Sequence, residues 1–164
     1  MRRMSRVSAA VAFTIVLGSG LAMPVLAMGP SPSAPAEATA KPVDPNFTEG
    51  KKAIDRKDWA AAVPLFQAVV AKDAKNADAF NWLGYAQRNN GDYTAAFAAY
   101  NEALKIDPRH KGAHEYIGEA YLKVNDLAKA EEHLKRLDSL CAFGCAEFTE
   151  LKTKIAAYKA AKPS

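Results

Sequence analysis

The chain of 164 residues lacks the short motifs by which many enzymes are identified. It has no G-x4-G-K-[ST] sequence, which cradles nucleotide phosphates, and no G-x-S-x-G sequence, which places a nucleophilic serine on a sharp turn. His114-Glu115 begins like the zinc-protease motif H-E-x-x-H, but Gly118 stands where the second histidine is required. We therefore expect a protein that is not an enzyme, with no catalytic residue and no cofactor.

Acidic residues are missing from residues 1–27, which contain Arg2, Arg3 and Arg6. The whole chain has 22 Lys and Arg against 18 Asp and Glu, but without these three arginines the counts nearly balance at 19 and 18. The basic character therefore belongs largely to the N-terminal segment. It gives no reason to expect a nucleic-acid partner.

Residues 1–27 have the three parts of a secretory signal peptide. The arginine-containing start precedes an apolar stretch at residues 7–17, and a signal peptidase would read the short residues that end at Ala27. The alternative is a membrane anchor, but two glycines and a proline interrupt the apolar run before the roughly 20 residues that a bilayer requires. We expect a cleaved signal peptide, export to the periplasm or beyond, and no stable membrane anchor.

Residues 28–42 are rich in proline and alanine. Four of these fifteen residues are prolines, and most of the others are small. Such a composition cannot bury enough apolar surface to form a core. The segment is predicted to be a disordered linker.

Several residue types recur at an interval of 34 residues in three successive copies. The repeated positions hold glycine, aspartate, a bulky residue, alanine and two packing residues. They are Gly50, Gly84 and Gly118; Asp58, Asp92 and Asp126; Trp59, Tyr93 and Leu127; Ala62, Ala96 and Ala130; Phe66, Tyr100 and Leu134; and Val69, Ala103 and Leu137. Because six positions agree in size and polarity, we infer an internal repeat.

Each copy is predicted to form two helices joined by a tight turn. In the middle copy, Gly91 permits the left-handed conformation that ends a helix, and Asp92 is a favourable residue at the start of the next one. Asn125 and Lys57 occupy the place of Gly91 in the other copies, where a positive φ costs Lys57 more. The second helix should end at Asp107, because the proline after it disfavours helix.

The small residues at two repeated positions predict close packing within each helix pair. We expect the backbones of two helices to approach there, and larger side chains to fill the space beside them. The small residues are Gly84, Gly118, Ala96 and Ala130, and the larger ones are Tyr100 and Leu134. A leucine in place of Gly84 would overpack this crossing.

These positions resemble the tetratricopeptide repeat, whose pattern is W-x2-L-G-x2-Y, then A-x3-F, then P. The middle copy matches best, at Phe80, Leu83, Gly84, Ala96, Tyr100, Ala103 and Pro108. The first copy departs at Glu49 and the third at His114. The resemblance implies an all-α fold, a right-handed α-solenoid with three helix-turn-helix repeats at residues 43–76, 77–110 and 111–144.

Residues 145–162 are predicted to add one helix after the last repeat. Phe148, Leu151, Ile155 and Tyr158 form an apolar stripe at helical spacing, with lysine and glutamate at most other positions. The end of a repeat array needs a helix with one polar face. We interpret this segment as the C-terminal capping helix.

The resemblance also implies that the first helix of each repeat lines a concave groove. The residues at its ligand-facing positions are Phe47, Lys51, Ile54, Asp55, Asn81, Tyr85, Arg88, Asn89, Glu115, Glu119, Leu122 and Lys123. Aromatic, basic and acidic groups together favour an extended or helical peptide, anchored by Phe47 or Tyr85. The alternative is a solvated face that binds nothing specific.

Cys141 and Cys145 are the only cysteines. In an exported protein we expect a disulfide between them, formed because Gly144 breaks the helix. The alternative is a thiol-exchange or copper site. The C-x3-C spacing differs from that of the C-x-x-C redox motif.

His110 and His114 are four residues apart, a spacing that could place both imidazoles on one helical face for zinc or copper. The alternative, which we favour, is a turn histidine and a histidine at the edge of the core, with no metal site. His133 has no partner near it in the sequence.

The sequence as a whole predicts an exported adaptor or scaffold that binds another protein or peptide, in the assembly of a cell-envelope complex. The alternative is a periplasmic protein that handles thiols or metals (copper or zinc) through Cys141 and Cys145.

Overall fold

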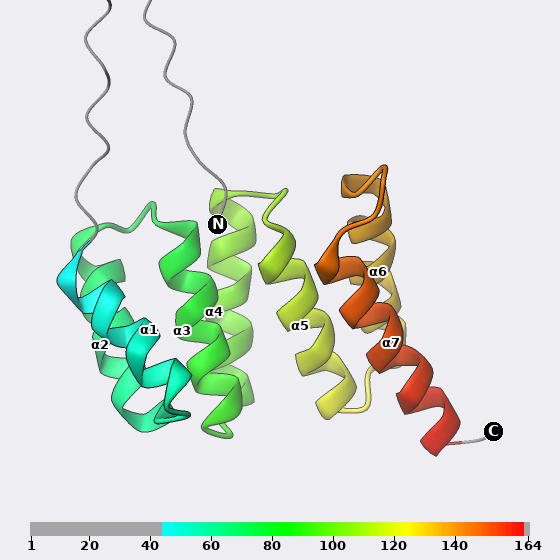
Figure 1. Cartoon of the computed structure of the whole chain (residues 1–164), viewed down its shortest axis with the longest axis horizontal. Helices are drawn as coiled ribbons and strands as arrows, with labels where there is room; N and C mark the ends of the chain where they lie inside the picture. Colours follow the sequence, from blue (N-terminus) through cyan, green and yellow to red (C-terminus); the bar gives the residue numbers. More distant parts are fainter. Residues whose placement is uncertain (1–43, 163–164) are drawn as a thin grey trace, which may run out of the picture. The chain divides into compact units, whose positions relative to one another are not determined.

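The computed structural model describes residues 44–162, which form seven helices and no strand (Figure 1). The helices are α1 (Pro45–Asp55), α2 (Trp59–Lys72), α3 (Ala77–Asn89), α4 (Tyr93–Ile106), α5 (Lys111–Lys123), α6 (Leu127–Leu140) and α7 (Ala146–Ala161). The predicted signal peptide at residues 1–27 and the predicted linker at residues 28–42 lie outside the described residues. Among the helices of residues 44–162, none is long and apolar enough to cross a membrane.

The helices are stacked in two layers. Helices α1, α3, α5 and α7 form the front layer in Figure 1, and α2, α4 and α6 lie behind them. Helices α1, α3 and α5 each pack against the helix that follows in the chain, and α7 packs against α6, which precedes it. Within the front layer α3 also contacts α1 and α5, and α5 contacts α7. This arrangement confirms the prediction of an all-α solenoid of helical repeats. We call the layer of α1, α3, α5 and α7 the inner layer, and that of α2, α4 and α6 the outer layer.

The turn within each helix pair has the predicted chemistry. Lys57, Gly91 and Asn125 have positive φ angles of 59°, 91° and 64°, so all three copies use the left-handed conformation. The aspartate that follows each of them accepts a hydrogen bond from a backbone N–H of the next helix, as Asp92 does from Ala95 at 2.9 Å. The side-chain cap satisfies an N–H group that has no partner within the helix.

The glycines of the inner layer accommodate side chains of neighbouring helices. A Cβ atom at Gly84 would lie 2.7 Å from ring atoms of Tyr100 in α4. At Gly118 the nearest atoms belong to Leu151 of α7, 2.6 Å from such a Cβ, where we expected Leu134. The nearest atoms at these sites are thus side-chain atoms, and the prediction that two backbones meet there needs this correction.

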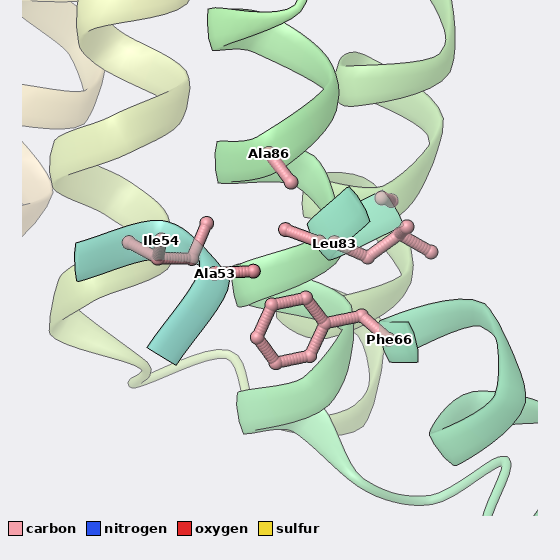
Figure 2. Packing of buried hydrophobic residues seen from close by; sticks show 7 residues of the cluster. Ala53, Ile54, Phe66, Leu83 and Ala86 are labelled. Carbon is pink, nitrogen blue, oxygen red and sulfur yellow. The ribbon is translucent and has the colours of Figure 1, made fainter. Parts of the chain in front are cut away.

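The hydrophobic core runs between the two layers. Figure 2 shows its first part, where Phe66 of α2 lies beside Ala53 of α1, and Leu83 and Ala86 of α3 complete the cluster. Phe66 is fully buried. The core continues through Tyr100 and two further clusters toward α7. Each pair therefore buries apolar surface against the next, as a repeat array requires.

The last helix is held in place by a covalent and an apolar connection. Cys141 and Cys145 form a disulfide across the turn before α7, and Gly144 in that turn has a φ of 85°. Leu151 and Ile155 of α7 are buried in a cluster with Leu137 of α6. The predicted apolar stripe thus faces the core, and α7 closes the array.

Candidate functional site

A pocket of about 630 Å³ opens between α3, α5 and α7 in the inner layer. The residues from α3 and α5 that line it are Tyr85, Arg88, Asn89, Glu119, Leu122 and Lys123, all of which the sequence placed in the groove. Lys154, Ala157 and Tyr158 of α7 complete the wall. These three residues were not predicted to line the groove, because residues 145–162 were interpreted only as a capping helix that packs on the last repeat. We call this site the inner pocket.

The inner pocket contains a chain of ion pairs that joins three helices. Arg88 Nη1 of α3 lies 2.5 Å from Glu119 Oε2 of α5, and Lys154 of α7 donates to the other carboxylate oxygen. The side chains of Arg88 and Glu119 are each only 8% exposed, whereas Lys154 is 45% exposed. Glu119 therefore pairs with two cations at once, and hydrogen bonds between charged groups of this kind are among the strongest in proteins.

Aromatic rings cover the inner layer beside this pocket. The ring of Tyr85 lies 5.5 Å from Trp82 and 4.8 Å from Tyr116, between ring centres. Lys51 Nζ is 3.1 Å from the centre of the Trp82 ring, and the Arg88 guanidinium is 5.2 Å from that of Tyr85. Cations stabilise such ring faces electrostatically. Trp82 and Tyr116 were not predicted as groove residues, because each is the residue after a ligand-facing position of the repeat pattern.

Other predicted groove residues lie outside the inner pocket. Phe47 packs edge-on against Phe66, with 5.6 Å between the ring centres, so its ring contributes to the core. Asn81 is only 3% exposed, and its Oδ1 atom has no hydrogen-bond partner within the described part of the chain. Asp55 is exposed at the end of α1. The structure thus gathers the α3 and α5 residues and leaves Phe47 and Asp55 apart from them.

Glu115 is a buried acid next to the inner pocket, with 9% of its surface exposed. Burial raises the pKa of Glu115 to about 7, and the negative charge of Glu119 acts in the same direction, while Lys154 opposes it. Glu147 and Glu150 of α7 also raise this pKa. The acid therefore changes its charge near neutral pH.

Two family models described as "Tetratricopeptide repeat" match residues 47–110 and 87–155. Together they span most of the seven helices. The chain belongs to the tetratricopeptide repeat family.

Curated relatives of this tetratricopeptide repeat protein are similar to it over part of their length. The Protein O-mannosyl-transferase TMTC3 of Homo sapiens is 29% identical over 83 residues, which cover 51% of this chain and 9% of that protein. The PEX5-related protein of Rattus norvegicus is 28% identical over 89 residues, 54% of this chain and 15% of that protein. The match spans less than a sixth of either relative.

Solved structures share the fold over most of their length. PcrH, in complex with the chaperone binding region of PopD, has a TM-score of 0.63 at 23% identity and covers 71% of this chain and 90% of its own. SycD of Yersinia enterocolitica, with a peptide of the translocator YopD, has a TM-score of 0.61 at 24% identity, with coverages of 71% and 88%. The TPR2B domain of yeast Sti1, in a pHsp70 complex, has a TM-score of 0.63 at 22% identity, with coverages of 68% and 94%.

His110 and His114, for which a metal site was the less favoured alternative, face different partners. His110 Nδ1 accepts from the backbone N–H of Ala113, and its Nε2 lies 2.9 Å from Asp78 Oδ1. His114 Nε2 donates to the Pro108 carbonyl, and its Nδ1 lies 2.9 Å from Nδ1 of His133. Between residues 44 and 162, the structure has no group of three or more His, Cys, Asp or Glu placed to hold a metal ion.

In the pair of the third repeat, His114 is buried and His133 is half-buried, and both are uncharged at neutral pH. Burial lowers the pKa of His114, and burial together with the nearby charges of His114 and Arg136 lowers the pKa of His133 to about 4. Because a carbonyl only accepts, the neutral His114 carries its proton on Nε2, and His133 Nδ1–H then donates to His114. His133 is thus the partner of His114 that only the fold brings near.

Proposed function

We propose that this tetratricopeptide repeat protein is a non-enzymatic adaptor that binds a peptide segment of another protein in its inner pocket. The observation that carries this proposal is the 630 Å³ pocket, to which α3, α5 and α7 all contribute. A pocket of this size is within the range of sites that hold small ligands or peptide side chains.

The lining of the inner pocket favours a peptide with both apolar and polar side chains. Tyr85, Leu122 and Tyr158 offer apolar surface, and Asn89 and Lys123 at the rim are exposed polar groups. The Asn89 Nδ2–H donates to the Tyr85 carbonyl at 2.8 Å, so its Oδ1 atom and the Lys123 ammonium are the groups offered to a peptide. Rigid aromatic anchors with adaptable polar neighbours are typical of surfaces that bind proteins. The ion pairs of Glu119 with Arg88 and Lys154 join the three helices that line the pocket.

The similar structures support this use of the fold. PcrH and SycD are described with segments of PopD and YopD, and the Sti1 domain is described with pHsp70. The finer role that we propose is assistance in the assembly of a cell-envelope complex after export. This role rests on the signal-peptide pattern of residues 1–27.

A thiol- or metal-handling function has no comparable support. Cys141 and Cys145 are joined in a disulfide, and His110 and His114 turn to different partners. The disulfide constrains the turn before α7.

Site-specific photo-crosslinking tests the proposed function in the native cell. A benzophenone amino acid at Asn89, on the rim of the inner pocket, should crosslink a discrete partner protein. The same group at Gln67, which is exposed on α2 in the outer layer, is the matched control position. The crosslink from Asn89 should weaken at least several-fold with Lys123→Glu, because this change reverses the charge at the rim.

Lys75→Glu provides the control substitution, since Lys75 is exposed in the turn between α2 and α3. The Asn89 crosslink should persist in this variant. Equal crosslinking from Asn89 and Gln67, or equal losses with both charge reversals, would show that the inner pocket is not the binding surface.

A further inference from the structure

A second pocket, of about 490 Å³, lies in the outer layer between α4 and α6. The turn between α4 and α5 contributes Arg109, and α6 contributes Arg136 and Ser139. Leu104 of α4 and Leu140 of α6 form its apolar wall. We call this site the outer pocket. It shares no lining residue with the inner pocket.

The hydrogen-bond donors of the outer pocket are nearly all engaged, apart from its two arginines. The Ser139 hydroxyl donates to the carbonyl of Lys135 at 3.0 Å. The Nε2–H of His114, which also lines the pocket, donates to the Pro108 carbonyl. The only donors left to face a ligand there are the guanidinium groups of Arg109 and Arg136, which no carboxylate within residues 44–162 pairs with.

The two pockets differ in how their cations are balanced. In the inner pocket, Glu119 already pairs with both Arg88 and Lys154. The acids near the outer pocket are Asp107, Asp138 and Glu132, the last of which lines an adjacent pocket with Arg136. None of the three forms an ion pair with Arg109 or Arg136 within residues 44–162, and Asp107 Oδ1 accepts the backbone N–H of Arg109. Arg109 and Arg136 are both exposed and keep their guanidinium donors free of carboxylate partners in the described part of the chain, so this pocket offers positive charge and open donors that favour an anion.

The apolar wall narrows the chemistry of that anion. Leu104 and Leu140 are half-buried and leave part of their surface open toward the pocket. A small hydrated anion would leave this surface in contact with water, whereas an anion that carries an apolar group would cover it. The planar guanidinium has the geometry of a carboxylate, which it binds through two parallel hydrogen bonds.

We propose that the outer pocket binds the carboxylate of a glutamate or aspartate side chain within an apolar peptide segment, with Arg109 and Arg136 holding the carboxylate and Leu104 and Leu140 holding its apolar neighbours. This site is separate from the inner pocket. It would give the adaptor a second contact, on its outer layer, with an acidic partner.

NMR titration of the purified protein tests the proposal with defined probes. The probes are the blocked peptide acetyl-Leu-Glu-Leu-amide, its glutamine analogue, and inorganic phosphate. We expect the glutamate peptide to cause saturable shifts of the guanidinium signals of Arg109 and Arg136 and of the methyl signals of Leu104 and Leu140. The affinity of the glutamine peptide should be lower by about tenfold or more, because a charge-assisted hydrogen bond is lost.

Variants separate this site from other cationic surfaces. Arg136→Gln should abolish the shifts at Leu104 and Leu140, while Arg56→Gln, at an exposed arginine after α1, should leave them unchanged. Lys123→Glu in the inner pocket should also leave them unchanged, so failure of the proposed function does not affect this test.

Three results would overturn the proposal. The first is the absence of saturable shifts at Arg109 and Arg136 with the glutamate peptide. The second is equal binding of the glutamate and glutamine peptides. The third is phosphate binding as tight as that of the glutamate peptide without any effect at the leucine methyls, which would identify a site for free anions instead.

Discussion

Arg88 and Glu119 lie 31 residues apart in the chain, and their side chains form an ion pair of 2.5 Å with only 8% of either exposed. Both charges are largely removed from water, so each depends on the other for its stabilisation. Lys154 adds a second cation to the same carboxylate from α7. The two ion pairs that share Glu119 thus connect the second repeat, the third repeat and the capping helix.

Glu119→Gln should destabilise the protein by about 3–5 kcal/mol, because it leaves Arg88 buried without a compensating charge. Urea unfolding monitored by circular dichroism measures this difference. Glu102→Gln is the matched control, since Glu102 pairs with Lys105 on an exposed surface. The control should change the free energy of unfolding by less than about 1 kcal/mol. Similar losses in both variants would contradict the role of the buried pair.

Gly84→Ala should lower the free energy of unfolding by about 1–3 kcal/mol, because the new Cβ would lie 2.7 Å from the ring of Tyr100. Thermal unfolding should show a decrease of several degrees. Gly112→Ala is the control within α5, where a Cβ would lie 3.3 Å from the side-chain amide of Asn81. Alanine favours helix over glycine, so the control should be neutral or stabilising. If Gly84→Ala is as stable as the control, the close packing of the Tyr100 ring does not require glycine at position 84.

The raised pKa of Glu115 predicts a pH dependence of stability. The ordinary pKa of a glutamate carboxyl is 4.5, and that of Glu115 in the folded protein is about 7. Between these values the folded state binds the proton more tightly, so this group's contribution to stability falls as the pH rises from 4.5 to 7. Glu115→Gln should remove this decline and stabilise the protein above pH 7 by about 1–3 kcal/mol. Urea unfolding at pH 5 and pH 8 measures the free energy of unfolding of both proteins. If the variant shows the same pH dependence as the parent protein, Glu115 is not the group responsible.

His133 should act in the opposite direction at lower pH. Its pKa is about 4 in the folded protein, against the ordinary histidine pKa of 6.5, so the unfolded state takes up the proton first as the pH falls. Stability from the neutral pair with His114 is therefore present above pH 6.5 and lost as the pH falls toward 4. NMR titration of the ring protons should show His133 still neutral at pH 5.5. A titration midpoint near 6.5 would contradict the burial of this ring in the pair.

The repeat, the turns within it and the fold class could be predicted from the order of the residues alone. The period of 34 residues, the aspartate caps and the left-handed positions at Lys57, Gly91 and Asn125 all depend on residues close together in the chain. Local conformational preferences and helical periodicity are properties of short segments, so one sequence is enough to read them.

The side-chain contacts between different helices could not be predicted and are seen in the folded structure alone. It placed Leu151 against Gly118, joined His114 to His133, and brought Lys154 and Tyr158 of α7 into the pocket with Arg88. The groove positions on α3 and α5 were predictable from the repeat pattern, but the contribution of α7 was not. A capping helix has no repeat partner to set its register, so its contacts follow from how its apolar face packs on the last repeat.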